Sequence, residues 1–476
     1  MRFLTLLLAV LSGLFLLTWA YHLPQALPTS PPTSQSPLTL TVNTPLDTLD
    51  ITPGDGLCAT AATTCSLRAA VTEANASPGL DTIIIPTGTF TLTTPAGSGE
   101  PDITIGDLNI TDDLIIRGAG PHQTIIDGGH HDRIFDIPCP EDPICSDHSP
   151  TIYIEDLTIR HGFAYQGAGL ANNGATLSLT NLIFHNNRSY GQGGGALYNH
   201  TGLLTVTHTT LISNTIVNSG YGSGAGGALY NWQGQSWLIN THIQNNTAYR
   251  GAAIYNYSSG QLTLINTTLT HNHADDAGGG LYNRGSATIA RSLFTTNTGA
   301  TGAAIYSQEG SLTLTNSTLH ANAATNAGGG LYATNFLLTY TTLSANIPTN
   351  LAGNNGQITA SILNHHPTHT NCHPTLNLTS LGHNLTSDTS CPTTQPTDLN
   401  DTPPLLAPLM DNGGPTLSQA PLPTSPALNH IPYDQANCAT TTTDQRGSWR
   451  PTIAACDIGA IEHLGHQTFI PLTHTP

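Results

Sequence analysis

The sequence predicts an all-β fold: a single-stranded parallel β-helix, a solenoid with coils of about 24 to 32 residues. The first observation is a phrase close to Gly-Gly-Gly-Leu-Tyr-Asn, which recurs seven times between Leu170 and Ala333. Repetition at this period is typical of solenoids. The second is composition, because these units are rich in Gly, Thr and Asn, which are poor helix formers and argue against helical repeats. The copies are anchored at Leu170, Leu197, Leu229, Ile254, Leu281, Ile305 and Leu331.

The third observation is a set of apolar positions at constant distances from an asparagine that closes each copy. Positions eight and ten residues before it are apolar in nearly every copy, and Thr and Ser lie mostly between them, as in a half-buried strand. In stacked coils these positions form a shared core, and the asparagine amides hydrogen bond along the axis. A leucine-rich repeat shares the Leu319-x-x-Asn322 spacing, but these units lack its Leu-x-x-Leu-x-Leu run. The closing residues are Asn187, Asn214, Asn246, Asn272, Asn297, Asn322 and Asn346; the predicted core contains Leu179, Val206, Leu238, Leu264, Ile289, Leu314 and Leu338 eight positions earlier, and Phe184, Leu211, Ile243, Leu269, Phe294, Leu319 and Leu343 three positions earlier.

The two ends of the chain differ in character from the repeats. An apolar run with one Arg opens the chain as in a secretion signal, and it is also long enough for an uncleaved membrane anchor. One amphipathic helix is predicted over Ser66–Ala76, where it would cover the open end of the coil stack. The predicted segments are a signal peptide or N-terminal anchor (1–20), a Pro/Thr/Ser-rich linker (21–40), an N-terminal cap with a short helix (41–80), the β-helix (81–364, with regular repeats over 166–346) and an irregular, disulfide-bearing C-terminal cap (365–476).

The charge and the cysteine content limit the cellular compartments and the classes of binding partner that are expected for this protein. The formal net charge is −18, and all basic residues are arginines. This balance argues against nucleic acid and anionic membranes, which bind basic patches. An even number of cysteines behind a secretion signal predicts disulfides, whereas zinc is disfavoured because no Cys-x-x-Cys spacing occurs. Pairing by proximity would join Cys58 to Cys65, Cys139 to Cys145, Cys372 to Cys391 and Cys438 to Cys456.

A tyrosine directly follows the anchoring Leu or Ile in six copies. If the anchor faces the core, strand alternation turns the tyrosine outward, so the six are expected to form a ladder on one face. Such a ladder can contact sugar rings, and its members can also stack on one another. The candidate glycan-contact residues are Tyr198, Tyr230, Tyr255, Tyr282, Tyr306 and Tyr332.

No residue is predicted to be catalytic, and no cofactor is expected. A polysaccharide lyase would need clustered carboxylates for Ca²⁺ and an Arg base, and an inverting hydrolase would need two or three carboxylates. Asp275-Asp276 has no acidic counterpart in the neighbouring copies, and His130-His131-Asp132-Arg133 fits a turn, so both favour structural roles. The densest ligand-like cluster is a weak metal-binding candidate formed by His365, His366, His369 and His373 beside Cys372.

Two groups of motifs carry a family resemblance. Cys65-Ser-Leu-Arg-Ala-Ala-Val-Thr-Glu-Ala-Asn75 resembles the Cys-Ser-Leu-Arg-Glu-Ala segment that opens many bacterial surface β-helix proteins, with Ala69 in place of Glu. The C-terminal phrases resemble the choice-of-anchor Q domain. The resemblance implies a secreted or surface-displayed right-handed parallel β-helix, similar to pectin-lyase-like and polymorphic outer-membrane repeat proteins. These phrases are Asp411-Asn-Gly-Gly-Pro-Thr-Leu417, Ser425-Pro-Ala427, Asp444-Gln-Arg-Gly447 and Cys456-Asp-Ile-Gly-Ala-Ile-Glu462.

These observations favour a secreted or cell-surface protein without enzymatic activity. It would act as an adhesin, a glycan binder or a structural surface protein, with an extracellular polysaccharide or a cell-surface glycan as its partner. We assume a monomer. The alternative is a polysaccharide lyase or glycoside hydrolase of pectin-lyase-like fold, and Ca²⁺ would be needed only in that case.

Overall fold

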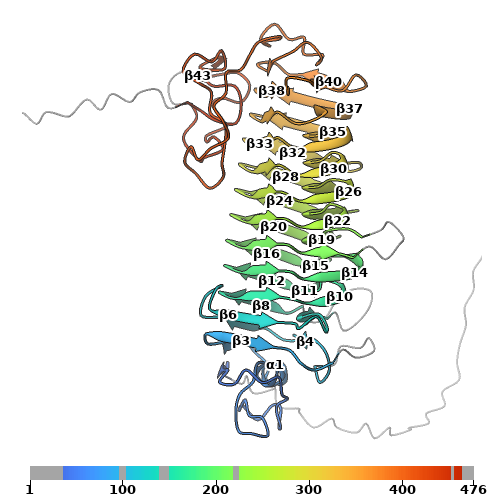
Figure 1. The fold of residues 1–476 in the computed structure, drawn as a ribbon. Coiled ribbons are helices and arrows are strands. Elements are labelled where there is room, and N and C mark those ends of the chain that lie inside the picture. Colours follow the sequence, from blue (N-terminus) through green and yellow to red (C-terminus); the bar gives the residue numbers. More distant parts are fainter. Residues whose placement is uncertain (1–35, 96–102, 139–148, 218–223, 452–454, 464–476) are drawn as a thin grey trace, which may run out of the picture. The chain divides into compact units, whose positions relative to one another are not determined.

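The computed structural model describes residues 36–95, 103–138, 149–217, 224–451 and 455–463. The predicted signal segment, most of the linker and the pair Cys139/Cys145 lie outside the described residues. Within the described ranges, no helix is both long enough and apolar enough to span a membrane. The described residues contain one helix, α1. The strands of the solenoid stack on one another in parallel register (Figure 1). The prediction of an all-β parallel β-helix is therefore confirmed.

Each regular coil contributes to three parallel sheets. The large sheet takes two strands from most coils, first the strand of the repeated phrase and then the Thr-rich strand that follows it. Its strands are β1 (Thr39–Thr41), β2 (Asp81–Ile84), β4 (Leu108–Asn109), β5 (Leu114–Arg117), β7 (Phe135–Ile137), β8 (Thr151–Glu155), β11 (Leu170–Asn173), β12 (Thr176–Thr180), β15 (Leu197–His200), β16 (Leu203–Thr207), β19 (Leu229–Trp232), β20 (Gln235–Ile239), β23 (Ile254–Tyr257), β24 (Gln261–Ile265), β27 (Leu281–Asn283), β28 (Ser286–Ala290), β31 (Ile305–Ser307), β32 (Leu312–Thr315), β35 (Leu331–Thr339), β37 (Thr349–Thr359), β39 (Thr370–Cys372) and β40 (Asn377–Ser380).

The second and third sheets complete the coil. The second sheet contains β3 (Gly88–Thr91), β6 (Thr124–Asp127), β9 (Thr158–Arg160), β13 (Ile183–His185), β17 (Thr210–Ile212), β21 (His242–Gln244), β25 (Thr268–Thr270), β29 (Leu293–Thr295), β33 (Thr318–His320), β36 (Thr342–Ser344), β38 (Ile362–Asn364) and β41 (Leu385–Thr386). The third sheet contains β10 (Phe163–Gln166), β14 (Arg188–Gly193), β18 (Thr215–Ile216), β22 (Thr247–Arg250), β26 (His273–Ala277), β30 (Thr298–Thr301) and β34 (Ala323–Ala327).

Identical repeat positions stack directly on one another and form the core. Leu314, for example, pairs in register with Ile289 on one side and with Leu338 on the other. All fourteen predicted core residues are at most 1% exposed. Ser236 is the polar exception in the column ten positions before the asparagine, and its hydroxyl donates to Asn231 Oδ1 at 2.9 Å. The serine is tolerated because its hydroxyl has this buried partner.

The closing asparagines form a buried ladder along the axis. From Asn187 to Asn346, each side-chain amide nitrogen donates to the side-chain oxygen of the next asparagine at 2.9–3.1 Å. A second ladder, which we did not predict, links the asparagines of the repeated phrase, from Asn172 to Asn283, at 2.8–2.9 Å. Both ladders satisfy backbone groups at the turns as well, so stacking and turn geometry are fixed together.

Asn322→Ala is expected to destabilise the neighbouring coils by about 1–3 kcal/mol, because it leaves buried polar groups without partners. Asn322 Oδ1 accepts from the backbone and side-chain nitrogens of Asn297, and its amide donates to Phe294 O. Asn354→Ala is the matched control, since Asn354 is exposed. Chemical denaturation of both variants measures the difference; equal stabilities would show that the ladder contributes nothing.

Glycine is required where the third sheet turns into the repeated phrase. Gly278 has a φ of +69°, and a Cβ atom built there would lie 2.5 Å from Leu281 O. Positive φ is strained for most L residues, and this close approach to backbone leaves no room for a side chain. The glycines of the phrase are therefore structural.

The helix α1 (Leu67–Ala76) contacts β2 and β4 at the N-terminal end of the coil stack (Figure 1). Ser66 caps it, because its Oγ accepts from Ala69 N at 3.0 Å. Arg68 is buried and donates to Asp47 Oδ1 at 2.7 Å and to Gly106 O at 2.6 Å. The predicted helix is thus present. The coil stack nevertheless begins earlier than the cap boundary, since β1 starts at Thr39 within the predicted linker.

The solenoid also extends further toward the C-terminus than expected. Strands β39 to β41 add a coil beyond residue 364, and this coil lacks the repeated phrase, which is why sequence periodicity did not reveal it. The following module contains the antiparallel pair β42 (Ile431–Pro432) and β43 (Ala455–Cys456). It hydrogen bonds to the second sheet, for example from Thr318 Oγ1 to Gln445 Oε1 at 2.6 Å. The observed disulfides are Cys58–Cys65, Cys372–Cys391 and Cys438–Cys456.

Candidate functional site

The six tyrosines of the repeated phrase form one continuous stacked column. Parallel register places each of them opposite the next, from β15 to β35. Successive ring centroids lie 5.6, 5.2, 4.8, 4.8 and 5.3 Å apart along the column. Most adjacent rings are tilted by less than 32°, so aromatic stacking runs along the solenoid axis.

The expectation of an outward-facing ladder needs correction. The tyrosines lie outside the central core, as strand alternation requires, but Tyr198, Tyr230, Tyr255 and Tyr282 are only 3–7% exposed. Tyr306 and Tyr332 alone among the six are half-buried. The physical reason is that two rows of side chains stand on either side of the column and close over its N-terminal part. Among the six tyrosines, accessible ring surface is therefore concentrated at Tyr306 and Tyr332, at the C-terminal end of the ladder.

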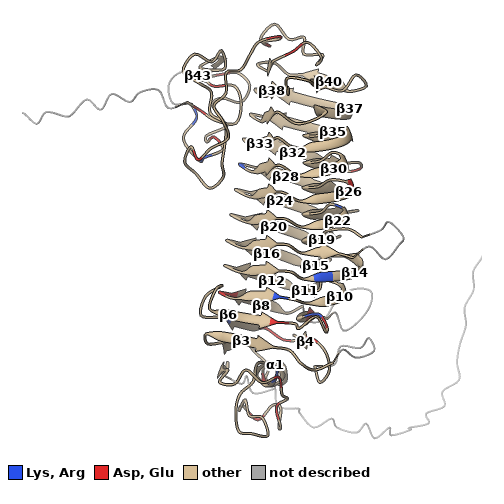
Figure 2. Ribbon diagram, viewed as in Figure 1, with Lys and Arg blue, Asp and Glu red and all other residues tan. Residues whose placement is uncertain are grey.

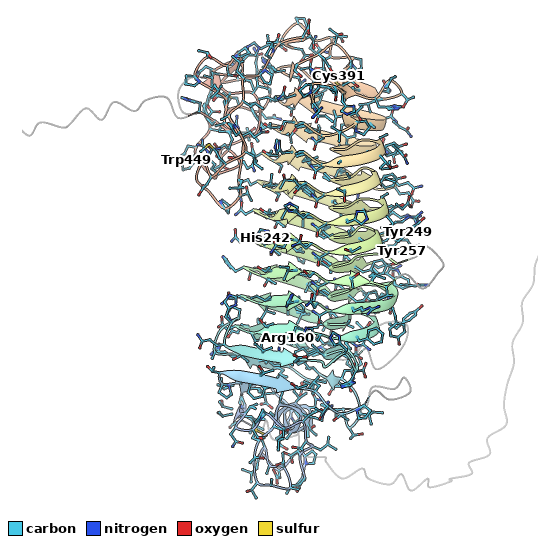
Figure 3. The ribbon with its side chains drawn as sticks, in the orientation of Figure 1. Arg160, His242, Tyr249, Tyr257, Cys391 and Trp449 are labelled. Atoms are coloured by element: carbon cyan, nitrogen blue, oxygen red, sulfur yellow. A yellow bond between two sulfur atoms is a disulfide. The ribbon has the colours of Figure 1, made fainter. Side chains whose placement is uncertain are left out.

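The first covering row comes from the residue two positions after the tyrosine of each phrase. In the early coils this residue is large and aromatic: the Trp232 ring lies 6.3 Å from the Tyr230 ring, and the Tyr257 ring lies 5.8 Å from the Tyr255 ring. In the later coils it becomes Arg284, Gln308 and Thr334. Figure 3 labels Tyr257 beside Tyr249 along this side of the solenoid. We did not single out this position in the sequence, although its loss of aromatic residues along the chain was a readable signal.

The second covering row comes from the ends of the third-sheet strands. Register shifts between β22 and β26, and again between β26 and β30, interrupt regular pairing where Arg250 and Asp276 lie. Arg250 Nε lies 2.6 Å from Asp276 Oδ2, and its guanidinium lies 5.6 Å from the centre of the Tyr282 ring. Asp276 therefore has a defined partner in the preceding coil.

Between the two rows lies a groove with a volume of about 560 Å³. Its floor is made of the last three tyrosines, and its walls are polar. Figure 2 shows how sparse charged residues are over most of the solenoid. Three of the residues that line this groove, Arg250, Asp276 and Arg284, are charged. The lining residues are Arg250, Asp276, Ala277, Tyr282, Arg284, Thr301, Tyr306, Gln308, Asn326, Ala327 and Tyr332.

The hydroxyl groups of Tyr282 and Tyr306 are protonated at neutral pH. Burial raises the pKa of Tyr282 and of Tyr306 to about 12. Tyr282 Oη donates to Gln308 Oε1 at 3.0 Å. On the wall, Arg284 pairs with Glu309, and this hydrogen bond is the main reason that the pKa of the guanidinium is raised. The groove thus presents phenol donors, guanidinium donors and amide groups, a set suited to hydrogen bonding rather than to proton abstraction.

The histidines named as weak metal candidates have separate partners. His365 Nδ1 lies 2.6 Å from Ser387 Oγ, and His373 Nδ1 lies 2.9 Å from Thr375 Oγ1. The rings of His366 and His369 lie 5.4 Å apart. Within the described ranges, no three His, Cys, Asp or Glu side chains are placed to hold a metal ion. Cys372 is bonded to Cys391.

A second charged cluster lies below the tyrosine column, in the early coils. Arg133 Nε lies 2.9 Å from Asp107 Oδ2, and Arg133 Nη1 lies 3.1 Å from Asp136 Oδ1, with Asp132 close by. Burial raises the pKa of Asp136 to about 6. Three carboxylates and an arginine therefore meet here. The Arg133 guanidinium binds two of these carboxylates, Asp107 and Asp136, and both are less than 10% exposed. The cluster lies apart from the groove lining. His130 lies in a turn with a φ of 63°, and its ring centroid is 4.7 Å from that of His161.

The matching family model is described as the right handed beta helix region. It matches residues 166–346. This range coincides with the regular repeats and supports right-handed coils. No curated protein matches the chain.

Solved structures that are similar to this chain include three with low sequence identity and TM-scores below 0.5. A pectate lyase Pel9A structure has 13% identity and a TM-score of 0.47, and the match covers 90% of this chain and 97% of that one. The A-module of a mannuronan C-5 epimerase from Azotobacter vinelandii has 15% identity and a TM-score of 0.35, covering 68% and 96%. A PL6 alginate lyase complex with a trisaccharide has 11% identity and a TM-score of 0.34, covering 78% and 87%. At this level the likeness concerns the fold alone.

Proposed function

We propose that this protein is a secreted or cell-surface β-helix that binds glycans in the groove above Tyr282, Tyr306 and Tyr332. The observation that carries the proposal is the combination of an aromatic floor, accessible at Tyr306 and Tyr332, with polar walls in a volume of about 560 Å³. Pockets of this size that combine apolar surface with a few placed polar groups are typical ligand sites. Aromatic rings carrying a hydroxyl suit a sugar, which has both apolar C–H surfaces and hydroxyl groups.

The end of the tyrosine column offers the best-placed ring face. Tyr332 pairs in register with Ala352, so no aromatic ring of the next coil occupies that side of it. The other rings stack on one another along the axis, so neighbouring rings cover their faces. A bound sugar would stack on Tyr332 and hydrogen bond to the hydroxyls of Tyr306 and Tyr282.

Three features support an extracellular location for this protein and the family that its sequence motifs suggest. The described disulfides are typical of oxidising compartments. The Cys65–Asn75 motif coincides with the capping helix, and the C-terminal motifs supply a buried network in which Arg450 Nη1 bonds Glu462 Oε2 at 3.0 Å. These placements give the Cys65–Asn75 segment and the phrase that ends at Glu462 structural roles. We therefore infer membership of the family with the Cys-Ser-Leu-Arg-Glu-Ala and choice-of-anchor Q segments.

The residues that line the groove favour glycan binding without catalysis. Among the described lining residues there is one carboxylate, Asp276, and it is paired with Arg250. An inverting glycosidase uses two carboxylates on opposite sides of the scissile bond. The raised pKa of Tyr282 also makes its hydroxyl a poor base at neutral pH.

Replacing Tyr306 and Tyr332 together by alanine is expected to weaken glycan binding by about tenfold, since aromatic contacts contribute about 0.5–1.5 kcal/mol each. A panel of polysaccharides, tested with and without a chelator, identifies the glycan, and calorimetry measures the loss. Tyr153→Ala is the control, because Tyr153 is 41% exposed on β8 and does not line the groove. Release of unsaturated products from any polysaccharide would overturn the non-enzymatic assignment.

A further inference from the structure

The groove is closed at the end that faces the N-terminal coils. There the tyrosine column continues beneath Trp232 and Tyr257, and Tyr255 is only 5% exposed. Two guanidiniums approach this point from opposite walls: Arg250 lies over the Tyr282 ring, and Arg284 lies 4.9 Å from the centre of the Tyr257 ring. A polymer lying in the groove therefore meets side chains at this end and has no path along the column.

The opposite end of the groove is open. Within the described chain the third sheet ends at β34, and the next coil passes from Ile347 directly into β37. The wall that ends with Asn326 and Ala327 therefore stops at the same coil as the aromatic floor, where Tyr332 is followed by Ala352. The covering row is also small here, because the residue beside Tyr332 is Thr334.

The charges in and beside the groove are balanced. Asp276 lies 2.6 Å from Arg250, and Glu309 lies 2.5 Å from Arg284. Neither arginine of the groove is left as an uncompensated cation, and the whole chain carries a formal charge of −18. A polyanionic glycan would be repelled by this field and would have to displace a carboxylate to reach a guanidinium. Paired guanidinium and carboxylate groups still hold free N–H donors and lone pairs, which can bond adjacent hydroxyls.

From this geometry we infer that the groove binds the terminal sugars of an uncharged glycan chain. The chain enters from the C-terminal coils, lies over Tyr332 and Tyr306, and ends against Arg250 and Arg284. This inference rests on the proposed glycan-binding function and adds to it the class of glycan and the part of the chain that is bound.

Matched sets of short linear oligosaccharides, neutral or built from uronic acids, test the glycan class by competition at low and physiological salt. Neutral oligosaccharides should bind at least about tenfold more tightly than the uronates, with little dependence on salt. Asp276→Asn leaves Arg250 without its carboxylate, so uronate binding should rise about fivefold at low salt. Glu155→Gln is the matched control, because it removes the partner of Arg117 outside the groove.

A bulky group attached to one end of the preferred oligosaccharide tests recognition of the terminus. One of the two end-labelled forms should lose binding, and the form labelled at the other end should keep it. Equal binding of both forms, or wild-type preference for uronates, would overturn this inference while leaving the proposed function intact. Failure to bind any glycan would overturn both.

Discussion

Leu314→Asp is expected to unfold several neighbouring coils and to lower the melting temperature sharply. Leu314 is fully buried in β32, between Ile289 and Leu338 of the adjacent coils. An unpaired carboxylate at this position costs several kcal/mol, since no cation or donor is available in the apolar column. Stacked repeats are stabilised by their neighbours, so the damage spreads along the axis. Circular dichroism melting and hydrogen exchange measure both the loss and its extent.

Thr313→Asp is the control for this substitution. Thr313 precedes Leu314 on the same strand, is partly exposed, and points to the opposite face. The same carboxylate there remains hydrated, so stability should change by about 0.5 kcal/mol or less. Similar melting temperatures for the two variants would mean that the inward assignment of Leu314 is wrong.

Glu462→Gln is expected to destabilise the C-terminal module by about 3–5 kcal/mol, because it leaves a buried cation without its counterion. The Arg450 and Glu462 side chains are both fully buried and lie 3.0 Å apart. Arg450 also donates to Asp457 O at 2.8 Å, and its guanidinium lies 4.2 Å from the centre of the Tyr340 ring. Burial opposes its charge and lowers its pKa, so the carboxylate is the main compensation.

Limited proteolysis and hydrogen exchange distinguish the module from the solenoid in this experiment. Protection should fall in the C-terminal module, whereas the regular coils before it keep theirs. Glu309→Gln serves as the control, since Glu309 is half exposed in its pair with Arg284 and such pairs contribute about 1 kcal/mol or less. If the two glutamine variants were equally stable, the buried pair would not hold the module together.

The repeat pattern was enough to predict which residues face the core and how the coils stack. Leu314 and Asn322 illustrate why. Both belong to columns in which one chemical type recurs in every coil, and a parallel stack places like residues on like. Strand alternation then decides the side on which each residue lies. The same argument led from Ser66–Ala76 to an end-capping helix, because an amphipathic face with no partner in its own segment must cover something apolar.

The accessibility of the tyrosine column, by contrast, could not be predicted from the repeat pattern. Tyr255 and Tyr306 occupy equivalent positions in the repeat, yet one is buried and the other is half exposed. The difference comes from neighbours that break the repeat: Tyr257 covers the first, whereas Gln308 leaves the second open. The pair Arg250 and Asp276 likewise joins residues of different coils at a register shift. Repetition specifies columns, but accessibility depends on the size, charge and register of the residues that depart from it.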